Sequence, residues 1–222
     1  AMLIKMSMAP ERKGSKEFIR EATKEGVVIS LGHSNATFAQ AAAVIEAGAS
    51  MFTHTFNGMP DPMHHAPMIS NAAMAMHSVT DELICDGHHV QEPMVRALVQ
   101  EKGPEHIALI TDSMEAGMMP DGDYMLGELP VYVKDGMARL KHGDNLAGSV
   151  LQLKIAVKNV VDWNVVTPED AIMMASYVPA KSVNILNKCG SISPDKDADF
   201  LVLNPDMTLS ETYLDGKSRY QA

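Results

Sequence analysis

Short apolar runs alternate with longer windows of helical periodicity over the first half of the chain. The apolar runs are typical of strands buried on both faces, and they lie at residues 3–8, 27–32, 51–56, 83–86 and 107–111. Helical windows separate them at residues 16–25, 37–47, 68–78 and 93–101. In the second window Thr37 is in position for an N-cap and Gly48 for a C-cap. Repeated strand–helix units predict an α/β protein with a parallel sheet, either closed or open.

The pattern changes after Asp112. Residues 121–143 alternate short runs with Gly and Asp turns, which predicts one or two β-hairpins inserted before the next helix. Helical windows resume at residues 149–162, 168–175 and 179–186. The remaining residues return to short strands and turns, so we expect a small β-appendage at the end of the chain.

The composition narrows the classes of protein. Among the 222 residues, 46% are hydrophobic and 21% charged, which suits one large domain or two small ones and excludes a purely disordered chain. The formal net charge of −10 repels phosphate backbones and anionic lipid headgroups, so we expect neither nucleic acid nor a membrane as partner. No apolar run approaches the ~20 residues that span a bilayer, and the first residues do not resemble a signal peptide. We therefore expect a cytoplasmic protein.

Ionisable side chains sit at the ends of four of the predicted strands. They are His33, His54, one of His88 and His89, and Asp112. The carboxyl ends of parallel strands face the ligand crevice in α/β proteins, so we expect these side chains to lie together. A single histidine in an apolar strand is more often a hydrogen-bonded core residue, but the joint pattern favours chemistry. Two imidazoles can hold a divalent metal with open positions for water, and a carboxylate can take a proton from that water.

Several sequence blocks carry a resemblance to a known family. They are LGHSNAT (31–37), THTFNGM (53–59), DGHHV (86–90), LITDSMEAG (109–117), LAGSVLQL (146–153) and GSISPDKDADFLVLN (190–204). In this order they resemble the N-acetylglucosamine-6-phosphate deacetylase family of the amidohydrolase superfamily. The resemblance implies a partial, metal-dependent (β/α)8 barrel of the TIM type over residues 2–188, with the hairpin insertion at about 121–143, and a remnant of a small β-sandwich over residues 189–222. It also implies hydrolysis of the acetamide of N-acetylglucosamine-6-phosphate to glucosamine-6-phosphate and acetate, in amino-sugar catabolism.

The resemblance also implies roles for individual residues. His33 and His54 match the family's two metal-binding histidines, and Asp112 matches its catalytic aspartate. Asn57 and Gly58 match the phosphate-binding segment, and His89 matches a sugar-contacting histidine. Leu146, Ala147 and Gly148 match a loop that closes over the sugar. The implied cofactor is a divalent metal, zinc first, with iron, manganese or cobalt as alternatives. The implied partner is a small-molecule sugar phosphate.

Two positions depart from the family pattern. His65 stands where the family has a phosphate-binding arginine, and an imidazole lacks the planar fork that holds phosphate with two hydrogen bonds. The family's third metal ligand is a glutamate in an H-L-E-G-P motif, and this sequence contains no such motif. Glu11 lies at a strand end but matches a different family segment, so we do not assign it that role.

The strand count leaves three functional classes open. Five parallel strands are too few for an eight-stranded barrel, so we expect a C-terminal portion without the family's N-terminal segment, and a homo-oligomer or aggregate that covers the open edges. The chain is then a working deacetylase with a third ligand from a partner or from water, an inactive sugar-phosphate-binding module, or a fragment with no function of its own. Metal binding and turnover of N-acetylglucosamine-6-phosphate discriminate these classes.

Overall fold

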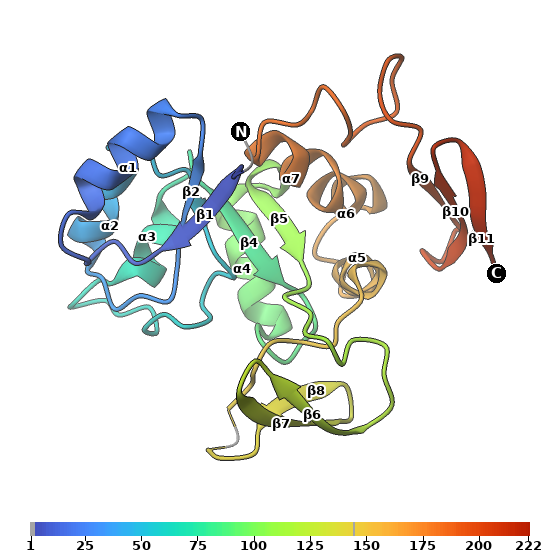
Figure 1. Cartoon of the computed structure of the whole chain (residues 1–222), viewed down its shortest axis with the longest axis horizontal. Coiled ribbons are helices and arrows are strands. Elements are labelled where there is room, and N and C mark those ends of the chain that lie inside the picture. The colour runs from blue at the N-terminus through green and yellow to red at the C-terminus, as the bar shows by residue number, and fades with distance from the viewer. Residues whose placement is uncertain (1–2, 144) are drawn as a thin grey trace.

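A five-stranded parallel sheet forms the centre of the molecule, in a computed structural model that describes residues 3–143 and 145–222. The strands are β1 (Lys5–Met8), β2 (Val28–Leu31), β3 (Met51–Phe52), β4 (Thr80–Ile84) and β5 (Ile107–Ile110). They lie side by side in chain order, and every neighbouring pair is parallel (Figure 1). Successive βα units of a barrel have this arrangement, which confirms the predicted α/β fold of partial-barrel type.

Apolar side chains on one face of the sheet pack against helices. Those that connect the strands are α1 (Ser15–Lys24), α2 (Phe38–Ile45), α3 (Ile69–Ala75) and α4 (Glu92–Lys102). One buried cluster joins Ile29, Leu31 and Phe52 to α1, α2 and α3. A second joins Leu83 and Leu109 to α4 and to a later helix, α5 (Leu153–Asp162). Burial of each such side chain stabilises the fold by roughly 1.5–3 kcal/mol, so this face holds the sheet in place.

The opposite face of the sheet carries polar side chains, because successive residues of a strand point to opposite faces. Thr53 Oγ1 lies 2.9 Å from Ser7 Oγ and 2.6 Å from Ser30 Oγ. Lys5 on β1 forms an ion pair with Glu82 on β4. Two strands separate β1 from β4, so this contact requires the sheet to curve toward its polar face, as a barrel wall does.

Beyond β5 the chain forms two small antiparallel sheets and three helices. The first sheet consists of β6 (Gly122–Leu126), β7 (Leu129–Lys134) and β8 (Met137–Leu140), joined by two hairpins as the pattern predicted. The helices are α5, α6 (Pro168–Ala175) and α7 (Tyr177–Ser182). The second sheet consists of β9 (Phe200–Leu203), β10 (Leu209–Leu214) and β11 (Lys217–Gln221). Figure 1 shows the helices between β5 and this β-appendage, and the first sheet projecting below the strand ends. The domain boundary at residues 188/189 stays a prediction, and a start at residue 2 lies outside the described residues.

Two predicted boundaries next to the strand ends are wrong for local reasons. β3 ends at Phe52 instead of residue 56, because His54 and Phe56 have left-handed φ angles of 31° and 75° that no strand accommodates. α5 begins at Leu153 instead of residue 149, because the backbone N–H of Ser149 donates to the carbonyl oxygen of Asp112 at 2.8 Å. Both differences put irregular backbone where the sequence predicted regular structure.

The ends of α2 and α7 agree only in part with the capping residues and bounds that the sequence predicted. Thr37 caps α2 as predicted, in a reciprocal capping box with Gln40. The same helix reaches its C-cap at Glu46, so the predicted C-cap at Gly48 is wrong by two residues. α7 ends at Ser182 instead of residue 186, shortly before Asn184 turns into the left-handed region at φ 60°.

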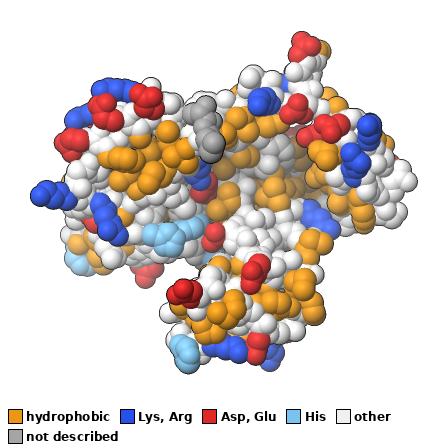
Figure 2. Space-filling view, in the orientation of Figure 1, with side chains coloured by type: hydrophobic (Ala, Val, Ile, Leu, Met, Phe, Trp, Pro, Cys, Tyr) orange, Lys and Arg blue, Asp and Glu red, His pale blue; other side chains and the backbone are white. Residues whose placement is uncertain are grey.

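The surface has apolar side chains at the beginning of the sheet. Leu3, Ile4 and Met6 are 52%, 47% and 39% exposed. Figure 2 shows hydrophobic side chains over several parts of this face of the molecule, with acidic and basic groups between them. Among the described residues, no helix has both the length and the apolar character needed to cross a membrane.

Candidate functional site

The predicted site residues follow the carboxyl ends of four neighbouring strands. His33 comes after β2, His54 after β3, His89 after β4 and Asp112 after β5. Because the strands are parallel and in chain order, these residues lie along one edge of the sheet. This edge is therefore the candidate functional site.

The two predicted metal ligands are in direct contact. The Nε2 atoms of His33 and His54 are 2.9 Å apart, and the two rings meet edge to face with centroids separated by 4.6 Å. His54 is 5% exposed, and its Nδ1 atom is buried without a hydrogen-bond partner. Both residues have left-handed φ angles, 48° for His33 and 31° for His54, which are sparsely populated and cluster at functional sites.

This pair fits two positions of a divalent metal site. Both imidazoles direct Nε2 toward the same point, and neutral imidazole is a common ligand of zinc and of other first-row metals. Among the described residues, no group of three His, Cys, Asp or Glu side chains is close enough to hold a metal ion. Among the described residues, His33 and His54 therefore supply two candidate ligands, and the source of a third stays a prediction.

The loop after β3 supports the histidine pair. The backbone N–H of Ser34 donates to the carbonyl oxygen of Gly58 at 2.9 Å, which ties the loop carrying His33 to the loop after His54. Gly58 has a φ of 60°, and a Cβ at that position would lie 3.0 Å from His33 Nδ1. The Asn57 side-chain amide donates to the carbonyl oxygen of His54 at 3.2 Å. Asn57 and Gly58 thus lie beside both histidines, whereas their phosphate-binding role stays a prediction.

Glu11 supports the same site from the end of β1. Its carboxylate accepts hydrogen bonds from Ser34 Oγ at 2.6 Å and from the backbone N–H of Asn35 at 2.9 Å. Partial burial raises the pKa of Glu11, but these hydrogen bonds and the Arg12 charge outweigh it and hold the pKa below its ordinary value. The sequence pattern indicated only that Glu11 lies at a strand end. Its structural role is to brace the residues that follow His33.

After β4, Asp86 anchors His89. One carboxylate oxygen of Asp86 lies 2.6 Å from His89 Nδ1, and the other accepts the backbone N–H groups of His88 and His89, both at 2.8 Å. Burial raises the pKa of Asp86, but the hydrogen bonds and the neighbouring imidazole outweigh it, so the pKa is lowered. The His89 side chain is 7% exposed, whereas His88 is exposed. Of the two histidines that the sequence left open, His89 is the one held in a fixed orientation.

The predicted substrate loop lies against the segment that carries Asp112. The Ser149 N–H donates to Asp112 O at 2.8 Å, and the Met114 N–H donates to Ser149 O at 2.9 Å. Ala147 is anchored on the other side, because its N–H donates to Ala138 O of β8 at 3.0 Å. Gly148 lies beside the exposed Asp112, with its Cβ position 3.4 Å from Asp112 O, whereas Leu146 and Ala147 lie against β8.

Among the described residues, no hydrogen bond joins His65 to another predicted site residue. His65 lies in the exposed segment before α3, and its ring packs against His64 with 4.8 Å between centroids. A phosphate contact from His65 stays a prediction.

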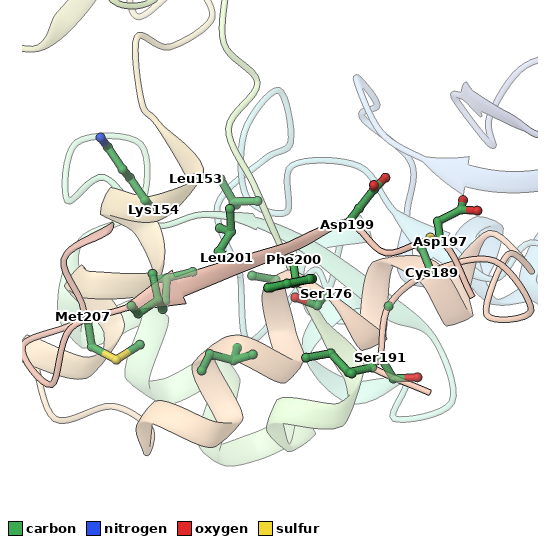
Figure 3. A pocket seen from close by; sticks show the side chains of 16 residues that line it. Leu153, Lys154, Ser176, Cys189, Ser191, Asp197, Asp199, Phe200, Leu201 and Met207 are labelled. Atoms are coloured by element: carbon green, nitrogen blue, oxygen red, sulfur yellow. The ribbon is translucent and has the colours of Figure 1, made fainter. Parts of the chain in front are cut away.

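A cavity of about 550 Å³ lies between α5, α6 and β9 (Figure 3). Its lining is mainly apolar and includes Leu153, Ile172 and Leu201, which are 37%, 45% and 54% exposed. None of the predicted site residues lines it. The candidate site therefore consists of the strand ends and their loops, separate from this cavity.

A curved parallel sheet with histidines and an aspartate at its carboxyl edge defines an α/β-barrel protein with a candidate metal site. Comparison with family models makes this more specific. The model described as "Amidohydrolase family" matches residues 9–219, and the chain belongs to this family. This confirms the resemblance to the amidohydrolase superfamily that the motif blocks indicated.

Curated relatives of this chain are named as deacetylases of N-acetylated sugar phosphates. An N-acetylglucosamine-6-phosphate deacetylase of Vibrio furnissii is 37% identical over 220 residues, covering 99% of this chain and 55% of the relative. An N-acetylgalactosamine-6-phosphate deacetylase of Escherichia coli O157:H7 is 37% identical over 212 residues, covering 96% and 56%. The chain thus spans about half the length of the curated relatives it matches.

Solved structures agree with this fold. The crystal structure of N-acetylglucosamine-6-phosphate deacetylase from Thermotoga maritima superposes with a TM-score of 0.93 at 32% identity, covering 100% of this chain and 60% of that one. A mutant of the Mycobacterium smegmatis enzyme in complex with N-acetyl-D-glucosamine-6-phosphate gives a TM-score of 0.89 at 33% identity, covering 96% and 57%.

Proposed function

We propose that this chain carries the carboxyl-edge active site of a metal-dependent N-acetylglucosamine-6-phosphate deacetylase. The observation that carries the proposal is the convergence of His33 Nε2 and His54 Nε2, 2.9 Å apart, on the strand edge that also carries Asp112. The names of the relatives support the reaction class. The reaction splits the acetamide of the sugar with water, giving glucosamine-6-phosphate and acetate.

His33 and His54 would hold a divalent metal through Nε2. Such a metal, when bound, lowers the pKa of water toward ~7 and polarises an amide carbonyl. Asp112 accepts the proton of the attacking water on its carboxylate and then donates that proton to the leaving amine. Asp112 is exposed and lies beside Gly148 and Ser149, so a sugar can approach it from solvent.

The sugar phosphate needs contacts at both ends. His89, oriented by Asp86, donates to or accepts from a sugar hydroxyl. Asn57 and Gly58 bind the phosphate through the side-chain amide and backbone, supplemented by His65 where the family has arginine. An imidazole binds phosphate more weakly than a bidentate guanidinium, so we expect weaker phosphate affinity than in the relatives.

A second substrate has support from one specific observation. The N-acetylgalactosamine-6-phosphate deacetylase relative is as similar to this chain, at 37% identity, as the N-acetylglucosamine-6-phosphate deacetylase relative. The two sugars differ only in the orientation of one hydroxyl group. Both carry the same acetamide and phosphate, so the proposed chemistry serves either.

Three finer points belong to the same proposal. The metal is zinc, because it tolerates a histidine-rich site with an open position. The protein acts as a homo-oligomer, because apolar side chains are exposed on β1 and on the two residues before it. It works in the cytoplasm, where sugar phosphates are the substrates of catabolism.

The test is acetate release from both sugar phosphates by the purified chain after titration with zinc. Release that needs zinc and is lost in Asp112→Asn supports the deacetylase. Zinc and sugar-phosphate binding without acetate release, followed by calorimetry, would identify a binding module instead. If neither zinc nor sugar phosphate binds, the proposed function is wrong.

A further inference from the structure

A buried ion pair lies behind the histidine pair, on the helix-covered face of the sheet. Asp81 Oδ2 of β4 is 2.5 Å from Lys102 Nζ at the end of α4, and both side chains are 0% exposed. The other Asp81 oxygen accepts a hydrogen bond from Thr55 Oγ1 at 2.9 Å. None of these residues has a role in the proposed reaction. Burial of charged groups costs desolvation free energy, so a fully buried pair indicates a specific role in the fold or the site.

Lys102 is held in place by more than Asp81. Its ammonium group also donates to the carbonyl oxygens of Ala73 and Met76, at 3.0 and 2.8 Å, where α3 ends. Two of the three donors of the ammonium group thus bind backbone carbonyl oxygens, and its charge pairs with Asp81. Burial raises the pKa of Asp81 to about 6, and the Lys102 charge opposes the rise. The pair is thus a fixed point that joins β4, α3 and α4.

Thr55 connects this fixed point to the candidate metal site. It lies between His54 and Phe56, whose φ angles of 31° and 75° are both in the left-handed region. Backbone of this kind persists only where its surroundings hold it on several sides. Thr55 is 0% exposed, and its own N–H donates to Glu82 O of β4 at 2.7 Å. Side chain and backbone of Thr55 are therefore both tied to β4.

We propose that Asp81, held by Lys102, is a positioning residue that acts through the Thr55 hydroxyl to fix the strained turn presenting His54. The proposal rests on the proposed function only in taking His54 as a metal ligand. The buried Nδ1 of His54 has no hydrogen-bond partner in the part of the chain that the structure describes. A histidine ligand is usually oriented by a partner on its second ring nitrogen; here the backbone on either side of the ring supplies that orientation.

The experiment compares three variants of the purified chain. Thr55→Val removes the hydroxyl and keeps the side-chain shape, whereas Thr55→Ser keeps the hydroxyl. Thr167→Ala is the matched control, because the Thr167 hydroxyl caps α6 by accepting the Asp170 N–H and touches none of these residues. Loss of such a cap lowers Tm by about 2–4 °C in a chain of this size.

The first readout is the zinc dissociation constant, measured by competition with a chelating dye. We expect Thr55→Val to weaken zinc binding by about 10–100-fold. Thr55→Ser should bind zinc within about threefold of the parent chain, and Thr167→Ala should match it despite its lower Tm. Parent-like zinc binding by Thr55→Val, or equal weakening by Thr167→Ala, would overturn the proposal.

The second readout needs no metal. The His54 ring resonances of the metal-free chain should shift in Thr55→Val and stay at the parent positions in Thr55→Ser and Thr167→Ala. Unshifted His54 resonances in Thr55→Val would refute the positioning role. If the parent chain binds no zinc, the proposed function fails, while the ring resonances still decide whether Thr55 positions His54.

Discussion

Replacing Gly58 with alanine would push a methyl group toward His33. A Cβ on Gly58 lies 3.0 Å from His33 Nδ1. This contact is tighter than an ordinary van der Waals contact, so the imidazole must move by a few tenths of an ångström. Gly58 also has a φ of 60°, where a residue with a Cβ costs roughly 1–2 kcal/mol. The substitution therefore combines a general backbone cost with a local displacement of one proposed metal ligand.

Gly127 separates these two effects. It too has a φ of 60°, in the turn between β6 and β7, but nothing lies within 4 Å of the point that a Cβ would occupy there. Gly58→Ala and Gly127→Ala should each lose about 1–2 kcal/mol of unfolding free energy in denaturant titrations. Only Gly58→Ala should also weaken zinc binding, by about tenfold, in competition titrations. Equal zinc affinity of the two variants would refute the assignment of His33 as a ligand braced by Gly58.

Other substitutions and conditions test the rest of the site. Asp112→Asn should lower acetate release by about 10²–10⁴-fold with zinc content unchanged by elemental analysis, because its role is proton transfer; a loss below about tenfold would contradict that role. Because the pKa of Asp86 is lowered in the fold, its ionised form stabilises the native state above about pH 4, and this contribution is lost as the pH falls through the folded pKa. Asp86→Asn should therefore give an unfolding free energy that falls less steeply with acid than the parent's, and identical slopes in denaturant titrations would count against the Asp86–His89 pair. Light scattering should find a homo-oligomer that covers Leu3 and Ile4, just before β1, whereas a monodisperse species of 24.0 kDa would exclude it.

The ends of β2 and β5 could be predicted because their signal is local. Each of these strands is a run of mainly apolar residues, and the ionisable residue shortly after it indicates both its end and the edge of the sheet. His33 and Asp112 were found in this way, and Thr37 was found as a helix cap from its own neighbours.

The beginning of β4 could not be predicted, because its residues are polar. Thr80, Asp81 and Glu82 precede the apolar run, so the pattern put the strand start at residue 83. Asp81 and Glu82 are buried only because Lys102 and Lys5, far along the chain, neutralise them. No local pattern contains that information.

The residues that brace the candidate site were hidden for a related reason. Asp86 stands three residues before His89, and Glu11 follows β1, so both positions were visible in the sequence. Their roles depend on which hydrogen bonds the folded loops complete, and this follows from side-chain geometry in three dimensions.

The ion pair between Lys5 and Glu82 sets an order for assembly during synthesis. Their separation of 77 residues means that β1 is made long before its charged partner on β4 exists. Until then the ammonium group of Lys5 stays in water. Contacts of such high sequence separation form late and leave early segments open to aggregation. β1 can pair in register with β2 as soon as β2 is translated, whereas the charge pair that spans the curve of the sheet forms only once β4 has been made.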